Sequence, residues 1–287
     1  MVLALNIFPM LATQSSILDA PLRAGLVVLL AGLICGTVAI VRFAPSRQLR
    51  VSPKLWGLRE LMIATAALLG LTVLTNAVYA VIALVTHREI ETLAPAILPV
   101  ELVLRVAALA GFIVFFRRRQ MPVAAALGLD ATSPVAALGW GVVFGLGSLP
   151  PVGAILAASE TVCRRLGFEP SEQPIAELFA TTNSMVMVVL LTVFAIVIAP
   201  VFEEFFFRGF AYPALKQRIG TRRALLIVSA AFAASHLHAP SFAPLFVLAL
   251  GLGLAYELTG SLLSSIAMHA VFNSVMVAHL FYQRAHS

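Results

Sequence analysis

The chain has 287 residues, of which 61% are hydrophobic and only 11% are charged, and its formal net charge is +6. Soluble domains carry about 25% charged residues, so this composition excludes a soluble protein and predicts an integral membrane protein. In hydrocarbon each span must satisfy its own backbone hydrogen bonds. We therefore expect an all-α fold, a polytopic transmembrane helix bundle of about eight segments of about 20 residues each.

Apolar stretches of suitable length recur along the chain. The sixth, Ala224 to Ser235, is too short to cross alone and is followed by His236 and His238. This pattern indicates a helix that ends inside the membrane, against protein or a wet cavity, and it is the first indication of a site. The other expected segments are Ala24 to Val41, Leu61 to Val85, Ile97 to Phe116, Val135 to Ala158, Met185 to Phe202, Phe242 to Leu258 and Leu262 to Tyr282.

Basic residues gather in alternate connections, and positively charged loops stay on the cytoplasmic side. If every segment crosses, residues 42–59, 117–119 and 216–223 face the cytoplasm and both termini lie outside. This asymmetry, with attraction to anionic lipid head groups, explains the net charge without a nucleic-acid partner. No basic leader precedes the first segment, so we expect no removable signal peptide and a multi-pass protein of the cell membrane.

The two parts of the chain differ in character. Residues 1–184, the N-terminal transmembrane helices with an extracytoplasmic loop, contain no catalytic motif and are expected to form a scaffold. Glu101 and Arg105 are charged residues within a span there, and their spacing of four allows them to pair on one helix face. Residues 185–287 place further ionisable side chains at membrane depth, so we expect the catalytic region there.

The first motif, EEFFFRG, begins at Glu203, directly after the apolar stretch that ends at Phe202. On a continuing helix Glu204 and Arg208 share a face and can pair, whereas Glu203 points about 100° away. Glu203 is then the carboxylate that can act as a general base or acid. Taken alone, the motif is explained equally well by interfacial glutamates before a basic loop.

Two histidine motifs follow, FAASH with Phe232 and His236, and HAVFN with His269 and Asn273. Alone, each has a structural explanation, as an interfacial histidine or as a hydrogen-bonded clamp between helices. Together with Glu203 they supply what a hydrolase needs. A carboxylate can take a proton from water, one imidazole can orient that water, and the other imidazole with the carboxamide can donate to an oxyanion.

The sequence lacks the residues that other classes of protease require. No HExxH zinc motif and no GxSxG motif occurs in the sequence. Asp19 and Asp130 are the only aspartates, and neither lies in an expected span, which excludes an intramembrane aspartyl dyad. Lys54 and Lys216 lie in expected loops, which argues against a Ser/Lys dyad.

The patterns EExxxR, FxxxH and HxxxN together resemble those of the type II CAAX prenyl protease and bacteriocin-processing (CPBP, or ABI) family of intramembrane glutamate proteases. The resemblance covers Val197 to Val277. It implies a helical membrane fold with a cavity open to the cytoplasm. The implied roles are water activation by Glu203 and His236, an oxyanion hole of His269 and Asn273, and support from Glu204, Arg208 and Phe232.

The resemblance implies an intramembrane endopeptidase that hydrolyses a peptide bond in a peptide or protein substrate, lipidated or membrane-associated. The sequence requires no cofactor, and it leaves zinc undecided. If zinc were bound, Glu203, His236 and His269 would be its ligands. The alternative is a non-catalytic membrane scaffold or bacteriocin-immunity protein on the same fold. A transporter with a proton relay is less favoured, because the sequence shows no inverted repeat.

Overall fold

The computed structural model describes residues 56–87, 94–165 and 174–286, and all regular secondary structure in these ranges is helical. Two of the elements, η2 and η3, are π-helical segments within a longer helix. The elements are α3 (Leu58–Thr86), α4 (Ala94–Arg118), α5 (Val123–Ala126), α6 (Pro134–Arg165), α7 (Pro174–Thr181), α8 (Met185–Val193), η2 (Phe194–Ile198), α9 (Ala199–Glu204), η3 (Phe205–Ala211), α10 (Tyr212–Ile219), α11 (Thr221–Ala234), α12 (Ala239–Thr259) and α13 (Leu262–His286).

Six helices in the described ranges are long and apolar enough to cross a membrane, which makes the protein a polytopic helical membrane protein, as predicted. The helix α11 has 14 residues, too few to cross alone, as the sequence indicated. The expected segment Ala24 to Val41 lies outside the described residues, so the number of eight stays a prediction. The six are Leu58–Thr86, Pro99–Arg118, Pro134–Arg164, Met185–Ile219, Ala239–Thr259 and Leu262–His286.

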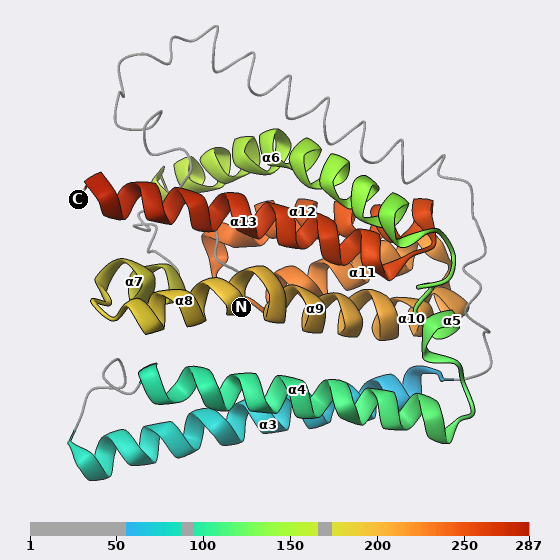
Figure 1. The fold of residues 1–287 in the computed structure, drawn as a ribbon, viewed down its shortest axis with the longest axis horizontal. Coiled ribbons are helices and arrows are strands. Elements are labelled where there is room, and N and C mark those ends of the chain that lie inside the picture. Colours follow the sequence, from blue (N-terminus) through green and yellow to red (C-terminus); the bar gives the residue numbers. More distant parts are fainter. Residues whose placement is uncertain (1–55, 88–93, 166–173, 287) are drawn as a thin grey trace, which may run out of the picture.

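The helices lie roughly parallel along the long axis of the bundle (Figure 1). The hairpin of α3 and α4 forms one side, and α8, α9 and α10 follow each other in a line beside it. On the other side α6 packs on both α12 and α13, and α11 packs on α12. The basic connections around α5 and α10 lie at the same end of the bundle.

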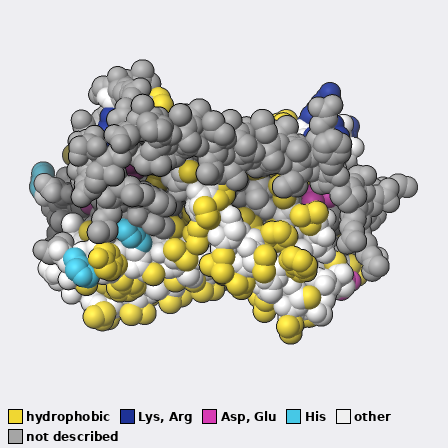
Figure 2. All heavy atoms as spheres, turned by 90° about the horizontal axis from the view of Figure 1, so that it is seen from above, with side chains coloured by type: hydrophobic (Ala, Val, Ile, Leu, Met, Phe, Trp, Pro, Cys, Tyr) yellow, Lys and Arg dark blue, Asp and Glu magenta, His cyan; other side chains and the backbone are white. Residues whose placement is uncertain are grey.

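The helix α12 is largely buried inside the bundle, whereas α3 is mostly exposed at its edge. In the most apolar window, 61% of the residues of α12 are buried inside the bundle, against 11% for α3. Hydrophobic side chains cover most of the described part of the face in Figure 2, and charged ones are few there. Such an apolar surface is the expected one for a protein whose solvent is lipid.

The expected fifth segment ended at Phe202, whereas the helix itself extends past this residue. The helix continues without a break, and the candidate span is Met185–Ile219. Glu203 and Glu204 therefore lie within a continuous helix of 35 residues, which is longer than the roughly 20 that cross a bilayer. Glu204 is neutralised within the bundle by its predicted pairing with Arg208, at 2.8 Å.

Two prolines explain why this long helix is irregular. Pro200 follows η2, and Pro213 follows η3. A proline has no N–H, and its ring collides with the carbonyl four residues earlier in a regular α-helix. Local widening to π geometry relieves this conflict, so the helix passes both prolines. The segment α9, where the EEFFFRG motif begins, is thus flanked by the π segments η2 and η3, and η3 carries the rest of the motif. Such π segments are frequent at functional sites.

Glycines on α6 bring its backbone against α13. A Cβ on Gly141 would lie 2.4 Å from that of Ala267, and a Cβ on Gly145 would lie 2.9 Å from that of Val271. These contacts flank His269 on α13. A small-xxx-small pair of this kind permits close approach of membrane helices, so it sets where α13 and its polar side chains stand in the bundle.

Candidate active site

Glu204 is the centre of a buried hydrogen-bonded network. Its side chain is fully buried and Oε1 accepts a hydrogen bond from Nη1 of Arg208 at 2.8 Å. Nη2 of the same arginine donates to the carbonyl of Ala249 on α12, also at 2.8 Å. The hydroxyl of Ser265 on α13 lies within hydrogen-bond distance of Oε2. The pair predicted from the i, i+4 spacing therefore exists, and it also ties three helices together.

His269 is oriented by the same carboxylate. Its Nδ1 lies 2.9 Å from Oε1 of Glu204, and its side chain is fully buried. An ionised carboxylate only accepts, so Nδ1 carries the proton and Nε2 holds the lone pair of the neutral ring. That Nε2 has no hydrogen-bond partner among the described residues, and it lies 3.9 Å from Oε2 of Glu203. The network thus turns the basic nitrogen of His269 toward Glu203.

Phe232 and His236 approach this centre from α11. The ring of Phe232 is fully buried, with its centroid 4.9 Å from that of His236 and 5.8 Å from that of His269. The guanidinium of Arg208 lies 4.8 Å from the centroid of the same ring. The phenylalanine of the second motif therefore packs between the two histidines and the arginine, which explains its place beside a charged network.

The short helix α11 ends where the sequence placed a break. Nδ1 of His236 lies 2.7 Å from the carbonyl of Phe232, which only accepts, so Nδ1 carries the proton here too. Nε2 of His236 is buried and has no hydrogen-bond partner in the described part of the chain. Its ring centroid lies 4.9 Å from that of Phe232, which also packs against the ring of His269. His236 thus offers a second lone pair to this centre.

Asn273 donates a hydrogen bond to the π-helical segment η2, which the sequence did not predict. Its Nδ2 donates to the carbonyl of Ala195 in η2 at 2.8 Å. In η2 the N–H of Ala199 donates to Phe194, and the next position, Pro200, has no N–H. The Ala195 carbonyl therefore lacks its usual backbone donor, and Asn273 replaces it. One amide hydrogen of Asn273 remains for another acceptor.

The structure thus brings together the side chains of Glu203, Glu204, Arg208, Phe232, His236 and His269, whereas Asn273, four residues after His269, contacts the carbonyl of Ala195. It also adds groups that no sequence pattern indicated. Ser265 is one of several serines near the start of α13, and no pattern distinguished it. The carbonyls of Ala195 and Ala249 are backbone groups, so no residue type in the sequence indicates that they accept these hydrogen bonds. Only the proline at position 200, read together with the asparagine, could have indicated an orphan carbonyl in this helix.

The ligands considered for zinc were Glu203, His236 and His269. Within the ranges that the structure describes, no three His, Cys, Asp or Glu side chains are grouped so that they could hold a metal ion. These side chains therefore do not form a zinc-ligand set in this arrangement.

Residues 185–275 match the model of the type II CAAX prenyl endopeptidase Rce1-like family. The match begins at the first residue of α8 and ends within α13, so it contains all three motifs. The match agrees with the resemblance that the three motifs predicted. No curated protein and no solved structure matches the chain.

Proposed function

We propose that the protein is an intramembrane endopeptidase of the CAAX-protease and bacteriocin-processing type, and that Glu203, His236, His269 and Asn273 carry its chemistry. The observation that supports this most directly is the approach of Nε2 of His269 to Oε2 of Glu203, at 3.9 Å. A carboxylate and an imidazole lone pair at this separation can hold a water molecule between them.

In this proposal Glu203 takes a proton from the water, and Nε2 of His236 accepts the water's second hydrogen and fixes its orientation. The proton can pass from Glu203 to Nε2 of His269, because Glu204 stabilises the resulting imidazolium through Nδ1. The protonated ring and the second amide hydrogen of Asn273 then donate to the tetrahedral oxyanion. Return of the proton to the leaving amine completes hydrolysis.

The same geometry refines the role of His269. A neutral ring with its proton on Nδ1 cannot donate from Nε2, so His269 serves the oxyanion hole only after it has been protonated. Proton transfer and oxyanion stabilisation are thereby coupled in one residue. We propose a peptide or protein substrate that reaches the site through a cavity open to the cytoplasm, in the cell membrane.

The test is cleavage of a peptide library, with prenylated and unmodified members, by purified protein in liposomes, with mass spectrometry of the products. Glu203→Gln removes the base and keeps the side-chain size. Glu177→Gln on α7, at an exposed position, is the matched control. Cleavage by the wild type and by Glu177→Gln, with none by Glu203→Gln, supports the proposal. Equal cleavage by all three contradicts it.

Absence of any wild-type cleavage would favour the alternative, a scaffold or immunity protein. The comparison of prenylated with unmodified peptides decides whether a lipid is required. A rate enhancement restricted to the prenylated members would assign a lipidated substrate, and equal rates would assign an unmodified peptide.

A further inference from the structure

The side chain of Asn76 is exposed on α3, although it lies well inside the membrane. Residues 61–86 of this helix carry no charge, and about 20 residues cross the hydrocarbon core. Every window of about 20 residues in that stretch contains Asn76, at least four residues or about 6 Å from its nearer end. Only 11% of the most apolar window of α3 is buried inside the bundle, so this carboxamide faces either lipid or a partner.

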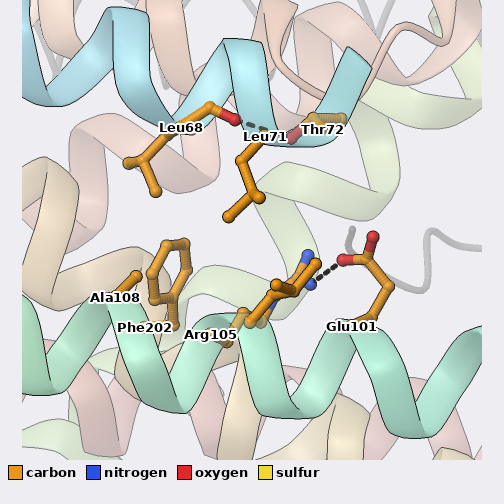
Figure 3. A pocket seen from close by; sticks show the side chains of 8 residues that line it. Leu68, Leu71, Thr72, Glu101, Arg105, Ala108 and Phe202 are labelled. Carbon is orange, nitrogen blue, oxygen red and sulfur yellow. Dashed lines mark hydrogen bonds and ion pairs between the residues drawn. The ribbon is translucent and has the colours of Figure 1, made fainter. Parts of the chain in front are cut away.

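The carboxamide of Asn76 is only partly hydrogen-bonded. Its Nδ2 donates to the carbonyl of Thr72 at 2.8 Å, and within the described residues this side chain makes no other hydrogen bond. The hydroxyl of Thr72 donates to the carbonyl of Leu68 at 3.0 Å, so its hydrogen does not serve Oδ1 of Asn76 (Figure 3). A carboxamide has two N–H donors and an acceptor oxygen. One donor and the oxygen therefore face hydrocarbon, which offers no hydrogen bonds.

Other polar side chains in the described spans have partners inside the bundle. Asn273 is the other asparagine of the six candidate spans, and it is fully buried and donates to the carbonyl of Ala195. The buried charges of Glu204 and Arg208 neutralise each other. Asn76 instead points out of the bundle, so any partner for it comes from outside the described part of the chain.

One possible partner is the expected first segment, Ala24 to Val41, which lies outside the described residues. Its sequence contains no asparagine, glutamine or charged residue, and its only polar side chains are those of Cys35 and Thr37. A thiol is a weak donor, and a hydroxyl has a single hydrogen. This segment therefore offers Asn76 a poorer match than a second carboxamide does.

A second copy of this chain supplies such a carboxamide at the correct depth. Two copies inserted in the same orientation are related by a two-fold axis along the membrane normal, and each residue of the interface then meets its counterpart at equal depth. Two asparagines can each donate one N–H to the oxygen of the other. Thr72 and Ala80, four residues before and after Asn76, are small and exposed, which permits close approach of two helices.

We propose that α3 is the interface of a symmetric homodimer in the membrane, in which the two Asn76 carboxamides donate to each other. The interface is the face of α3 centred on Asn76, and it is independent of the proposed peptidase function. Its other members are exposed residues at helical spacing from Asn76, namely Leu69, Thr72, Val73 and Ala80.

The experiment measures association in liposomes of decreasing protein density, by energy transfer between copies that carry a donor or an acceptor fluorophore at the C-terminus. Asn76→Leu should raise the dissociation constant by about five- to tenfold, because two reciprocal hydrogen bonds are lost. Ala80→Phe places a large side chain in the interface and should raise it by about tenfold or more. Ala67→Phe makes the same change about 180° around α3, also at an exposed position, and should leave association unchanged.

A disulfide test keeps Asn76 in place. In a chain with Cys35→Ser and Cys163→Ser, Leu69→Cys puts a thiol on the Asn76 face, and Leu74→Cys puts one on the opposite side of α3. The two leucines are matched in exposure, at 62% and 61%. Oxidation in liposomes should join two copies through position 69 and not through position 74, because a disulfide requires Cα atoms within about 7 Å.

Three results would overturn the dimer interface on α3. The first is a monomeric wild type at every protein density, and the second is equal association of the wild type, Asn76→Leu and Ala80→Phe. The third is a disulfide between Leu69→Cys and a retained Cys35 of the same chain, which would assign this face to the expected first segment.

Discussion

Nδ1 of His269 lies 2.9 Å from Oε1 of Glu204, the same oxygen that accepts a hydrogen bond from Arg208. The resemblance implied that the glutamate and arginine hold the helix geometry of the motif. Their pairing does this, and it also fixes the orientation and tautomer of an imidazole on α13. We therefore propose that the second glutamate of EExxxR positions the histidine of the third motif, and this relationship can be tested separately from the proposed base.

Glu204→Gln should cost both stability and activity. It leaves the fully buried Arg208 without a counterion, and breaking a buried pair destabilises by about 3–5 kcal/mol. It also removes the charge that stabilises protonated His269, so we expect kcat to fall by about 100-fold or more. Thermal unfolding in detergent, followed by the fluorescence of Trp56 and Trp140, measures the first effect, and peptide cleavage the second.

The double variant Glu204→Gln/Arg208→Met separates these effects, because it removes both buried charges. With both charges removed, no unpaired buried charge remains, so its unfolding temperature should recover toward the wild type. Cleavage should stay low, since His269 still lacks an ionised partner. Full activity in the double variant would contradict the assigned role of Glu204.

Ser265→Ala should slow the reaction without abolishing it. The hydroxyl of Ser265 contacts Oε2 of Glu204, and loss of one hydrogen bond to a charged group costs about 1.5–3 kcal/mol. We expect a kcat that is lower by about tenfold or more at similar KM, because substrate contacts are unchanged. Ser274→Ala on the same helix is the matched control, since that hydroxyl bonds only its own helix, at the carbonyl of Ala270. Equal effects of the two variants would argue against a positioning role for Ser265.

The predictions from the sequence were most successful for features that lie within a single helix. The pairs Glu101–Arg105 and Glu204–Arg208 follow from residues four apart on a helix, and both are present. The break before His236 follows from the length of the apolar run.

The helix continues past Phe202, where the expected fifth segment ended. Of the two charges that follow directly, Glu204 is compensated inside the bundle by Arg208. The contacts of Ser265 and Asn273 depend on how α13 packs against other helices. The position of α13 along α6 is set by close approaches such as that of Gly141 to Ala267. No spacing along the sequence reveals these approaches.

Gly141→Ala adds only one methyl group, yet it should strongly lower both the stability and the activity of the protein. A Cβ there would lie 2.4 Å from Ala267 and 2.8 Å from the carbonyl of Ser264, so α6 and α13 must separate. We expect a lower unfolding temperature and a loss of cleavage, because His269 moves with α13. Gly139→Ala and Gly147→Ala on the same helix meet nothing within 4 Å and should behave as the wild type. Unfolding and cleavage of the three variants, measured together, check this, and equal behaviour of all three would contradict the close packing.

The hydrogen bond from Asn273 to the Ala195 carbonyl can be tested with a second substitution that restores the stability lost in the first. Asn273→Leu removes the donor to the Ala195 carbonyl, and a buried acceptor left without a partner costs about 1–3 kcal/mol. Pro200→Ala restores a backbone N–H at the position where its absence created the orphan carbonyl. Asn273→Leu/Pro200→Ala should thus unfold at a higher temperature than Asn273→Leu alone.

Pro213→Ala is the matched control, because it changes the proline after η3 and supplies no donor near Ala195. It should give no comparable recovery in the Asn273→Leu background. Cleavage should stay absent in both double variants, since leucine cannot donate to the oxyanion. Equal recovery with either proline variant would mean that the gain comes from general helix stabilisation, and the assignment of Asn273 to the Ala195 carbonyl would then be wrong.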